Sequence, residues 1–584
     1  MSRPVVIAFF ALIAGVALSD FLLYDAVWLG SSSRRADWVV AGPWALGVLL
    51  AIVAWFCYRR EGHASVFSRR TWFPLLTFLF FLTLGFGRYA LVAERQHQMW
   101  AMQGRPVNRG NPDEFDYVRW CWVRGVTQRK QQDLSSDLRQ HWLQRMKELG
   151  MEEKTRAVVA AMTLGDRSLL TRDTRELFAD AGASHLLALS GLHLGIIVGL
   201  FLQLMNGRFL RSRWRYVLGV SVLLFAWMYA WLTGMPTSLV RAAMMTSVFI
   251  CASLLNRYGD PLQHLLLTGM IMLLVRPMYL FDVGAQLSFL SVAGILLFYQ
   301  PLYMWFFARW RYHIFWLERY WLLWPFTTFA VSLCAQVLTL PLVACYFHQV
   351  PVYGAVLSIV LIPLTTLFIM LAFMALLLSL LWPIAASFLS AGMTWIVSAM
   401  IWLMTGVSQW PGAVVKDFWS RKADPQLVIY NQRSCPALHV IASPSQSWLL
   451  MPEPEKADSG LYYIRRTFWQ RRLTAKPRLL RGSRGFVMGD LRVVMVNHGV
   501  GNRVAFSNSK AEPLDVLWIT RGFRGGQLRC LTERYALRLL VLDASLPLWQ
   551  RRALAQDAWQ HQWKVYDVAV QGALCVGLSR ELFQ

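Results

Sequence analysis

Long apolar runs and short alternating segments divide the chain into two kinds of sequence. Runs long enough to cross a bilayer, which takes about 20 residues in a helix, recur between Val5 and Trp410. Beyond Lys416 the apolar residues come in short segments bounded by turn residues, which is typical of strands. We therefore predict a polytopic α-helical membrane protein of about ten spans, with a C-terminal soluble α/β domain over residues 417–584.

Prolines interrupt two of the predicted spans. Pro341 and Pro363 are expected to kink their helices, because proline removes a backbone hydrogen bond and clashes with the preceding turn. The predicted spans are Val5–Leu29, Val39–Tyr58, Trp72–Val92, His185–Met205, Tyr216–Leu232, Val240–Leu255, Leu262–Val275, Asp282–Tyr303, Trp321–Tyr346, Val352–Leu381 and Pro383–Trp410.

Basic clusters predict the orientation, because loops rich in Lys and Arg stay in the cytoplasm. They lie at residues 59–70, 208–215 and 309–319, so the N-terminus is expected inside. Met1–Asp20 lacks a small-residue cleavage site and is interpreted as part of an uncleaved span. The predicted parts are N-terminal spans (1–92), an extracytoplasmic helical segment (93–183), a membrane domain (184–410) and an extracytoplasmic domain (417–584).

Shorter patterns predict the elements outside the membrane. Gln128–Leu149 and Glu152–Met162 have helical spacing, and Thr171–Phe178 resembles a capped amphipathic helix. In the last domain Pro547–Trp559 is predicted to be a helix and Tyr535–Arg538 a loop. The predicted strands there are Leu427–Tyr430, Leu438–Ala442, Trp448–Met451, Val487–Met488, Leu491–Val496, Val516–Thr520, Leu539–Asp543 and Leu574–Gly577.

The amino-acid composition supports the prediction of a membrane protein and shows that the chain is strongly basic. With 56% hydrophobic and 16% charged residues, the chain is too apolar for a soluble protein of 584 residues. The net charge of +25 fits either a polyanionic partner or an anionic membrane surface. The eight cysteines include no CxxC pair, so the sequence predicts neither a zinc site nor a redox motif, and no cofactor.

The most informative stretch is Ser184–Gly195, SHLLALSGLHLG, which opens an apolar segment yet carries His185, Ser190 and His193. An intramembrane histidine is a functional candidate, because lipid offers its nitrogens no partner. Gly191 and Gly195 would let a neighbouring helix approach closely. The same pattern also fits helix packing around two hydrogen-bonded histidines.

Other polar side chains lie within predicted spans. Arg241 has apolar residues on both sides and is either a buried functional charge or an arginine that snorkels to the interface. Asp282 is either its counter-ion or the N-cap of the following helix. Gln286, Ser288 and Gln336 fit a polar wall or interhelical hydrogen bonds.

Five segments in order resemble the ComEC competence family, whose members form the inner-membrane channel for DNA in natural transformation. Leu164–Gly195 (LGDRSLLTRDTRELFADAGASHLLALSGLHLG) is the most specific match. The other four are Asn111–Val126 (NPDEFDYVRWCWVRGV), Trp231–Met245 (WLTGMPTSLVRAAMM), Asp260–Leu297 (with FDVGAQLSF at its centre) and Ser332–Leu364 (SLCAQVLTLPLVACYFHQVPVYGAVLSIVLIPL).

The sequence departs from the family pattern at three points, and these departures limit which domains and activities of the family we expect here. Residues 93–110 are too few for the OB-like domain common in the family, which has five strands. Ser358 stands where the family often has Asn. The family's C-terminal domain is often metallo-β-lactamase-like with an HxHxDH metal motif; here DVLWITRG and LVLDAS resemble that domain, but His439, His498 and His561 are isolated. The resemblance therefore implies a short form with a degenerate domain, without metal or nuclease activity.

The resemblance implies a channel that carries single-stranded DNA into the cytoplasm, with DNA and the bilayer as partners. An extracytoplasmic DNA receptor and a cytoplasmic DNA-pulling or single-strand-binding protein are also expected. The path would be lined by His185, Ser190, His193, Arg241, Asp282, Gln286 and Gln336, with no catalytic residue. The alternatives are a membrane-embedded hydrolase using His185, Ser190 and His193, or a small-molecule secondary transporter.

Overall fold

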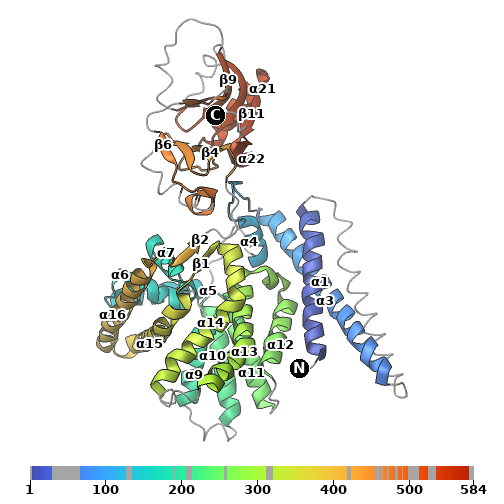
Figure 1. The fold of residues 1–584 in the computed structure, drawn as a ribbon, viewed down its shortest axis with the longest axis vertical. Helices are drawn as coiled ribbons and strands as arrows, with labels where there is room; N and C mark the ends of the chain where they lie inside the picture. The colour runs from blue at the N-terminus through green and yellow to red at the C-terminus, as the bar shows by residue number, and fades with distance from the viewer. Residues whose placement is uncertain are drawn as a thin grey trace. The chain divides into compact units, whose positions relative to one another are not determined.

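The computed structural model (Figure 1) divides into two compact units, which are described separately. Unit 1 comprises Met1–Arg105 and Trp120–Lys416, and unit 2 comprises Pro106–Arg119 and Asp417–Gln584. The predicted span Val39–Tyr58, Ser190, His498 and most of the three basic clusters lie outside the described residues. The structure describes residues 3–28, 66–104, 106–125, 134–187, 191–204, 214–255, 260–310, 320–416, 423–453, 461, 464–469, 472–480, 485–488, 491–497, 512–523 and 535–577.

Two N-terminal helices of unit 1 pack closely through glycines. Side chains at Gly15 of α1 (Arg3–Trp28) and Gly85 of α3 (Val66–Gln103) would collide with backbone carbonyls of the opposite helix. Arg88 of α3 donates hydrogen bonds to the carbonyls of Leu274 and Val275, which end α12. These contacts attach the N-terminal pair to the remaining helices of the unit.

The remaining apolar helices form a bundle (Figure 1). Within the described residues, seven helices of the chain are long and apolar enough to cross a membrane, and α10 and α12 are shorter apolar helices. The chain is therefore a polytopic membrane protein. The bundle helices are α9 (Gly191–Leu204), α10 (Trp214–Leu232), α11 (Thr237–Leu254), α12 (Pro261–Val275), α13 (Val283–Trp310), α14 (Tyr320–Phe347), α15 (Gly354–Leu381) and α16 (Pro383–Ser408).

Several more polar helices pack against α15 and α16, the last two helices of the bundle. Apolar residues of α15 and α16 share one core with residues from α5, α6 and α7. Thr171 caps α7 as predicted, since its side chain accepts a hydrogen bond from the Thr174 N–H at 3.3 Å. These elements are α5 (Leu134–Glu148), α6 (Glu153–Val159) with the π-helix η2 (Ala160–Leu164), α7 (Arg172–Asp180) and α8 (Ser184–Leu187), and α4 (Tyr117–Arg124) precedes them in the chain.

Unit 2 contains two five-stranded sheets that share an apolar core. One sheet has the order β12-β3-β4-β5-β6 and the other β11-β10-β9-β8-β7, with β8 to β11 parallel. The helix α21 (Leu548–Gln560) covers the second sheet through another core. The strands are β3 (Gln426–Ile429), β4 (Leu438–Ser443), β5 (Gln446–Leu450), β6 (Arg478–Leu480), β7 (Gly485–Met488), β8 (Leu491–Val496), β9 (Glu512–Ile519), β10 (Tyr535–Leu542), β11 (Lys564–Asp567) and β12 (Leu574–Gly577).

The segment 106–119, which follows α3 in the chain, is built into unit 2. The Asp113 carboxylate receives two hydrogen bonds from the Arg472 guanidinium, at 2.7 and 2.9 Å. Arg109 donates to the side-chain carbonyl of Gln432 at 3.0 Å. Gly110 has a positive φ and approaches the Cα of Gly572 so closely that a side chain would not fit without a shift.

One sequence prediction in unit 2 is wrong. Residues 535–538, predicted to be a loop, form the first half of β10, which pairs with β9 in parallel. Arg538 made this segment look polar, but its guanidinium reaches Asp515 on the neighbouring strand at 3.1 Å. An exposed charged residue in a strand can be satisfied across the sheet, and the local pattern does not reveal that partner.

Candidate functional site

A buried guanidinium occupies one end of the bundle. Arg241 is the fifth residue of α11 and is only 5% exposed. Its Nη2 lies 3.0 Å from where a Cβ on Gly191 of α9 would be, and its Cζ lies 5.9 Å from the ring centroid of Phe289 on α13. Nε and Nη1 have no hydrogen-bond partner among the described residues. A buried arginine stays charged, so this site has unused capacity to bind an anion.

His193 lies nearby on α9 and is fully buried. Neither ring nitrogen has a hydrogen-bond partner among the described residues, although the Met162 carbonyl faces the ring. His185 differs, because it is exposed and its Nδ1 contacts the Gly182 carbonyl at 3.1 Å. The two histidines therefore do not occupy equivalent positions. Ser190, the third polar residue of that stretch, lies outside the described residues.

The Asp282 carboxylate does not pair with Arg241 and does not cap α13 through any hydrogen bond that the structure records. Its Oδ1 faces the Arg124 guanidinium at 3.8 Å, while its buried Oδ2 has no partner among the described residues. One turn further along, Gln286 donates to the Leu280 carbonyl at 2.7 Å, and its side-chain oxygen is likewise unpaired. Both side chains thus keep free acceptors near the start of α13.

Three helices begin at this end of the bundle. Thr237, the first residue of α11, lies beside Gly284 at the start of α13, and Gly191, which begins α9, lies against Arg241. Each helix N-terminus carries a partial positive charge of about half a unit from its unpaired N–H groups. Arg241 adds a full charge within about 6 Å of the start of its helix. We name His193, Arg241, Asp282 and Gln286 the N-terminal cluster.

The other predicted residues are placed differently. Gln336 of α14 lies beside Gly354, and Gly354 in turn lies against Gly182, whose carbonyl contacts His185. Gln336 and His185 therefore lie near the same pair of glycines, away from Arg241. Gly191 makes the close approach expected of it, whereas no atom lies within 4 Å of where a side chain on Gly195 would begin. Pro341 and Pro363 both lie inside continuous helices, α14 and α15.

Sequence reasoning missed a group of arginines outside the bundle. Arg124 and Arg175 lie within electrostatic reach of Arg167, and Arg175 donates a hydrogen bond to the Arg167 carbonyl. Partial burial and these two neighbouring charges lower the pKa of Arg167. The sequence pattern does not reveal this group, because Arg124 is more than 40 residues away from Arg167 and Arg175 in the chain. Arg124 connects this group to Asp282 and so to the N-terminal cluster.

Asp543 and His439, two possible catalytic groups of unit 2, are buried and hydrogen-bonded to neighbouring side chains or backbone. Both oxygens of Asp543 accept hydrogen bonds, from the Trp518 indole at 3.0 Å and the Ser545 N–H at 2.8 Å. Burial raises the pKa of Asp543 to about 6. His439 is buried, and its Nδ1 contacts the Tyr430 hydroxyl at 2.7 Å. Within the described residues no three His, Cys, Asp or Glu side chains gather as a metal site would require.

The fold and this arrangement define a polytopic membrane protein with a buried arginine and further buried polar side chains at one end of its bundle. A family model described as "Competence protein" matches residues 162–430, and one described as "ComEC C-terminal domain" matches residues 427–578. Together the two models cover residues 162–578. The chain belongs to the ComEC competence family.

Two relatives agree with this assignment over part of their length. ComE operon protein 3 of Bacillus subtilis (strain 168) is 30% identical over 210 residues, which are 36% of this chain and 24% of that protein. Recombination protein 2 of Haemophilus influenzae is 28% identical over 200 residues, 32% of this chain and 25% of that protein. The chain thus matches only about a quarter of each of these two relatives. No solved structure matches.

Proposed function

We propose that this protein is an inner-membrane channel that carries single-stranded DNA into the cytoplasm during natural transformation, with DNA passing the N-terminal cluster. A phosphate backbone crosses a low-dielectric region only where polar or cationic groups replace its water. The observation that carries the proposal is Arg241, a buried cation with unpaired donors where three helices begin. Family membership supports DNA as the anion.

The N-terminal cluster does not favour the hydrolase alternative. A nucleophile–base pair needs a histidine that a third group orients. No described residue hydrogen-bonds to the His193 ring, and His185 contacts only a backbone carbonyl. The transporter alternative is distinguished in cells: loss of the protein should abolish uptake of free DNA while growth on ordinary nutrients is unchanged.

We also propose that residues 106–119 and 417–584 lie together outside the cytoplasmic membrane, as a degenerate metallo-β-lactamase-like domain without nuclease activity. A compact unit occupies one side of a membrane, so its two pieces imply an even number of crossings between residues 119 and 417. The basic clusters support the outer side. There the domain would receive DNA from an extracytoplasmic receptor, and a cytoplasmic partner would pull the strand inward.

The channel proposal is tested by Arg241→Gln in a strain that lacks the native gene. Uptake of labelled DNA into a nuclease-protected state should fall at least about tenfold, a loss of ~1.4 kcal/mol of stabilisation at the barrier. Arg241→Lys, which keeps the charge, should retain part of the activity. Arg145→Gln is the matched control, because that arginine lies on α5 of unit 1, outside the N-terminal cluster, and its side chain is 41% exposed. Normal uptake by Arg241→Gln at normal membrane levels would refute the proposed path.

The topology is tested with single cysteines at Val107 and Val570, which are 76% and 72% exposed. In a variant without native cysteines, both should react with an impermeant maleimide in intact spheroplasts. A reaction at one position and protection at the other would contradict the single-sided unit. Protection at both would place the domain in the cytoplasm.

A further inference from the structure

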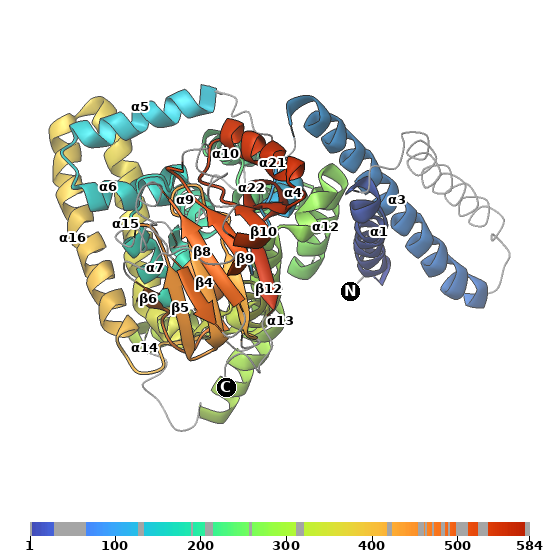
Figure 2. The ribbon, with the colours of Figure 1, turned by 90° about the horizontal axis from the view of Figure 1, so that it is seen from above.

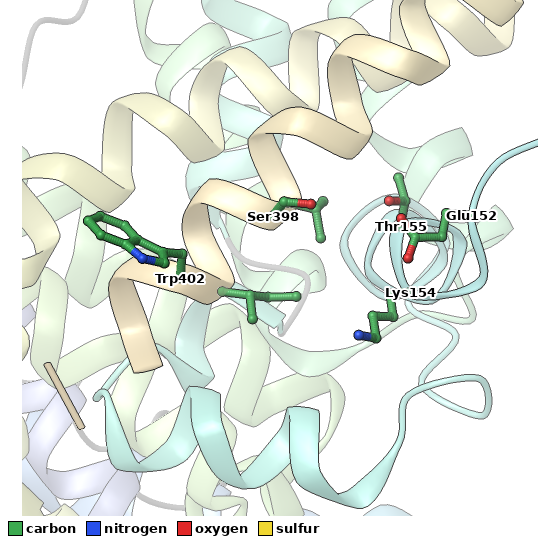
Figure 3. Close-up of a pocket in the computed structure, with 7 residues that line it drawn as sticks. Glu152, Lys154, Thr155, Ser398 and Trp402 are labelled. Atoms are coloured by element: carbon green, nitrogen blue, oxygen red, sulfur yellow. The ribbon is translucent and has the colours of Figure 1, made fainter. Parts of the chain in front are cut away.

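The middle of α16 lies against charged residues. Val397, Ser398 and Ile401, close to the centre of this 26-residue helix, line a cavity with Glu152 and Lys154 at the start of α6. Figure 3 shows Ser398 of α16 and the Glu152, Lys154 and Thr155 side chains of the α6 region on facing sides of this space. If α16 crossed the bilayer, its centre would bring these charges to the membrane midplane, where neither has an ion-pair partner in the described part of the chain.

An adjacent face of α16 carries an aromatic stripe, and the last residue of this stripe, Trp402, also lines the cavity beside Glu152 and Lys154. Phe388, Trp395 and Trp402 are spaced seven residues apart and are 75%, 82% and 77% exposed. Met393, Val397, Met400 and Met404 are instead buried in the core that α16 shares with α6 and α7. The aromatic stripe therefore faces away from this apolar core, and the flank of α16 beside the stripe faces the charged residues of α6. Trp is enriched at the level of the lipid headgroups.

The direction of α16 agrees with this reading. Figure 1 draws α1 at nearly full length, and Figure 2, seen from above, shows α16 and α5 at full length while α1 is foreshortened. Within unit 1, α16 thus runs crosswise to α1, which is one of the helices long and apolar enough to span. If α1 crosses the membrane, α16 lies near the membrane plane.

The chain segments that enter and leave the α15–α16 hairpin lie next to each other. The strand β1 (Gln349–Pro351), just before α15, pairs with β2 (Val414–Lys416), just after α16, and Val350 faces Val415 in this ladder. The hairpin must therefore begin and end on one side of the membrane. If α16 does not cross, α15 does not cross either. The even number of crossings implied by unit 2 holds in this case too, because the hairpin removes two crossings together.

We infer that α15 and α16, although long enough to span, form a hairpin on one side of the bilayer, with the aromatic stripe of α16 seated in the lipid headgroup region. The occupant of this surface is lipid. The stripe is a single row of exposed Trp and Phe along a helix that lies crosswise to α1, and its Trp402 end adjoins the charged residues of α6. This inference concerns how the protein sits in the membrane and does not depend on what it transports.

Nitroxide depth measurements test the inference on the full chain in liposomes. Spin labels are placed singly on cysteines that replace Phe388, Trp395 and Trp402, in a variant without native cysteines. The matched control is Leu333, Leu340 and Phe347 of α14, which share the same spacing and are 38%, 41% and 50% exposed. Depth is read from the ratio of collisions with oxygen and with a water-soluble nickel chelate.

The three α16 labels should lie at one depth, within about one helical turn of 5 Å, whereas the α14 labels should differ by about 10 Å for each seven residues. A deep Trp395 label between two shallow ones would show a spanning helix and overturn the inference. Labels shielded from both reagents would show protein in place of lipid, such as a second copy, and would also overturn it.

A second measurement does not depend on the stripe. Trp382, at the turn between α15 and α16, is 62% exposed, and Val352, just before α15, is 50% exposed. Single cysteines at these positions should react with an impermeant maleimide from the same side of the membrane. A spanning hairpin would place them on opposite sides, so labelling of only one in intact spheroplasts would refute the inference.

Discussion

Asn111 and Asn431 hold each other through two hydrogen bonds, although 320 residues separate them. The Asn431 N–H donates to Oδ1 of Asn111 at 2.8 Å, and Nδ2 of Asn111 donates to the Asn431 carbonyl at 3.4 Å. The Asn431 side chain also donates to the Arg109 carbonyl at 2.7 Å. The segment after α3 is therefore a structural part of unit 2, and its removal would leave buried polar groups without partners.

The ion pair between Asp113 and Arg472 should contribute to the stability of unit 2. Both side chains are largely covered, at 24% and 31% exposure, and the pair is bidentate. Arg472→Ala should lower the free energy of unfolding of this unit by about 1–3 kcal/mol. Limited proteolysis of the full-length protein in detergent measures this as faster cleavage within residues 417–584.

The control for that change is Arg538→Ala, which removes an ion pair whose arginine side chain is 82% exposed. Its effect should stay below about 1 kcal/mol, because exposed pairs contribute little. Equal protection of both variants and the wild type would contradict a structural role for residues 106–119.

Gly191 should be sensitive to a single added methyl group. A Cβ at this position would lie 3.0 Å from Nη2 of Arg241 and 3.2 Å from Cβ of Ala242, so Gly191→Ala should displace the guanidinium. We expect DNA uptake to fall severalfold while the protein remains in the membrane. Gly195→Ala, one turn along the same helix and facing open space, should leave uptake unchanged. Equal uptake by both variants would argue against a required position for Arg241.

Acid should destabilise unit 2 through His439. Burial lowers the pKa of His439 to about 3, whereas the unfolded chain titrates near 6.5. The unfolded state therefore binds more protons between these values, and the stability present above pH 6.5 is lost as the pH falls towards 3. Between pH 7.5 and pH 5 the loss from this residue should be about 2 kcal/mol.

The variant His439→Phe isolates this effect, since its stability should lack that part of the pH dependence even if it is lower overall. Asp543 acts in the opposite sense: its raised pKa of about 6 makes the folded state bind a proton more readily as the pH falls from 6 towards 4. Tryptophan fluorescence during denaturant unfolding, repeated at several pH values, measures the summed contribution of His439 and Asp543 to the free energy of unfolding. Parallel pH profiles for wild type and His439→Phe would refute the assignment.

Unit 2 should bind DNA without cutting it. The purified full-length protein should bind single-stranded DNA at low salt and release it steeply as salt rises, since phosphate contacts release counterions. Nicked product should not form with magnesium, manganese or zinc. Metal-dependent cleavage that Asp543→Ala abolishes would show a nuclease, because that change removes the one carboxylate at the end of β10.

The sequence was most informative where structure depends on near neighbours. The cap at Thr171 and the helix from Leu548 to Gln560 follow from local residues, and both were predicted closely. The first half of β10 was missed because the partner of Arg538 lies on another strand. The contacts of residues 106–119 with unit 2 join positions more than 300 residues apart, and no local pattern carries that information.

The polar residues of the bundle were identifiable, but their grouping was not. An arginine amid apolar residues indicated Arg241, yet its contacts with Gly191 and Phe289 depend on how three helices pack. Asp282 was expected to pair with Arg241 or to cap α13. The structure instead places Arg124 opposite its carboxylate, a residue that precedes it by more than 150 positions.

The hydrogen bonds between Asn111 and Asn431 also constrain biogenesis. A ribosome that adds about 5–20 residues per second needs roughly 15–60 s to cover the 320 residues between them. Residues 106–119 must therefore wait, without their partners, while the intervening helices enter the membrane. If one helix failed to insert, the two halves would emerge on opposite sides and the domain would remain open to proteases. Closure of this domain thus requires an even number of membrane crossings between its two pieces.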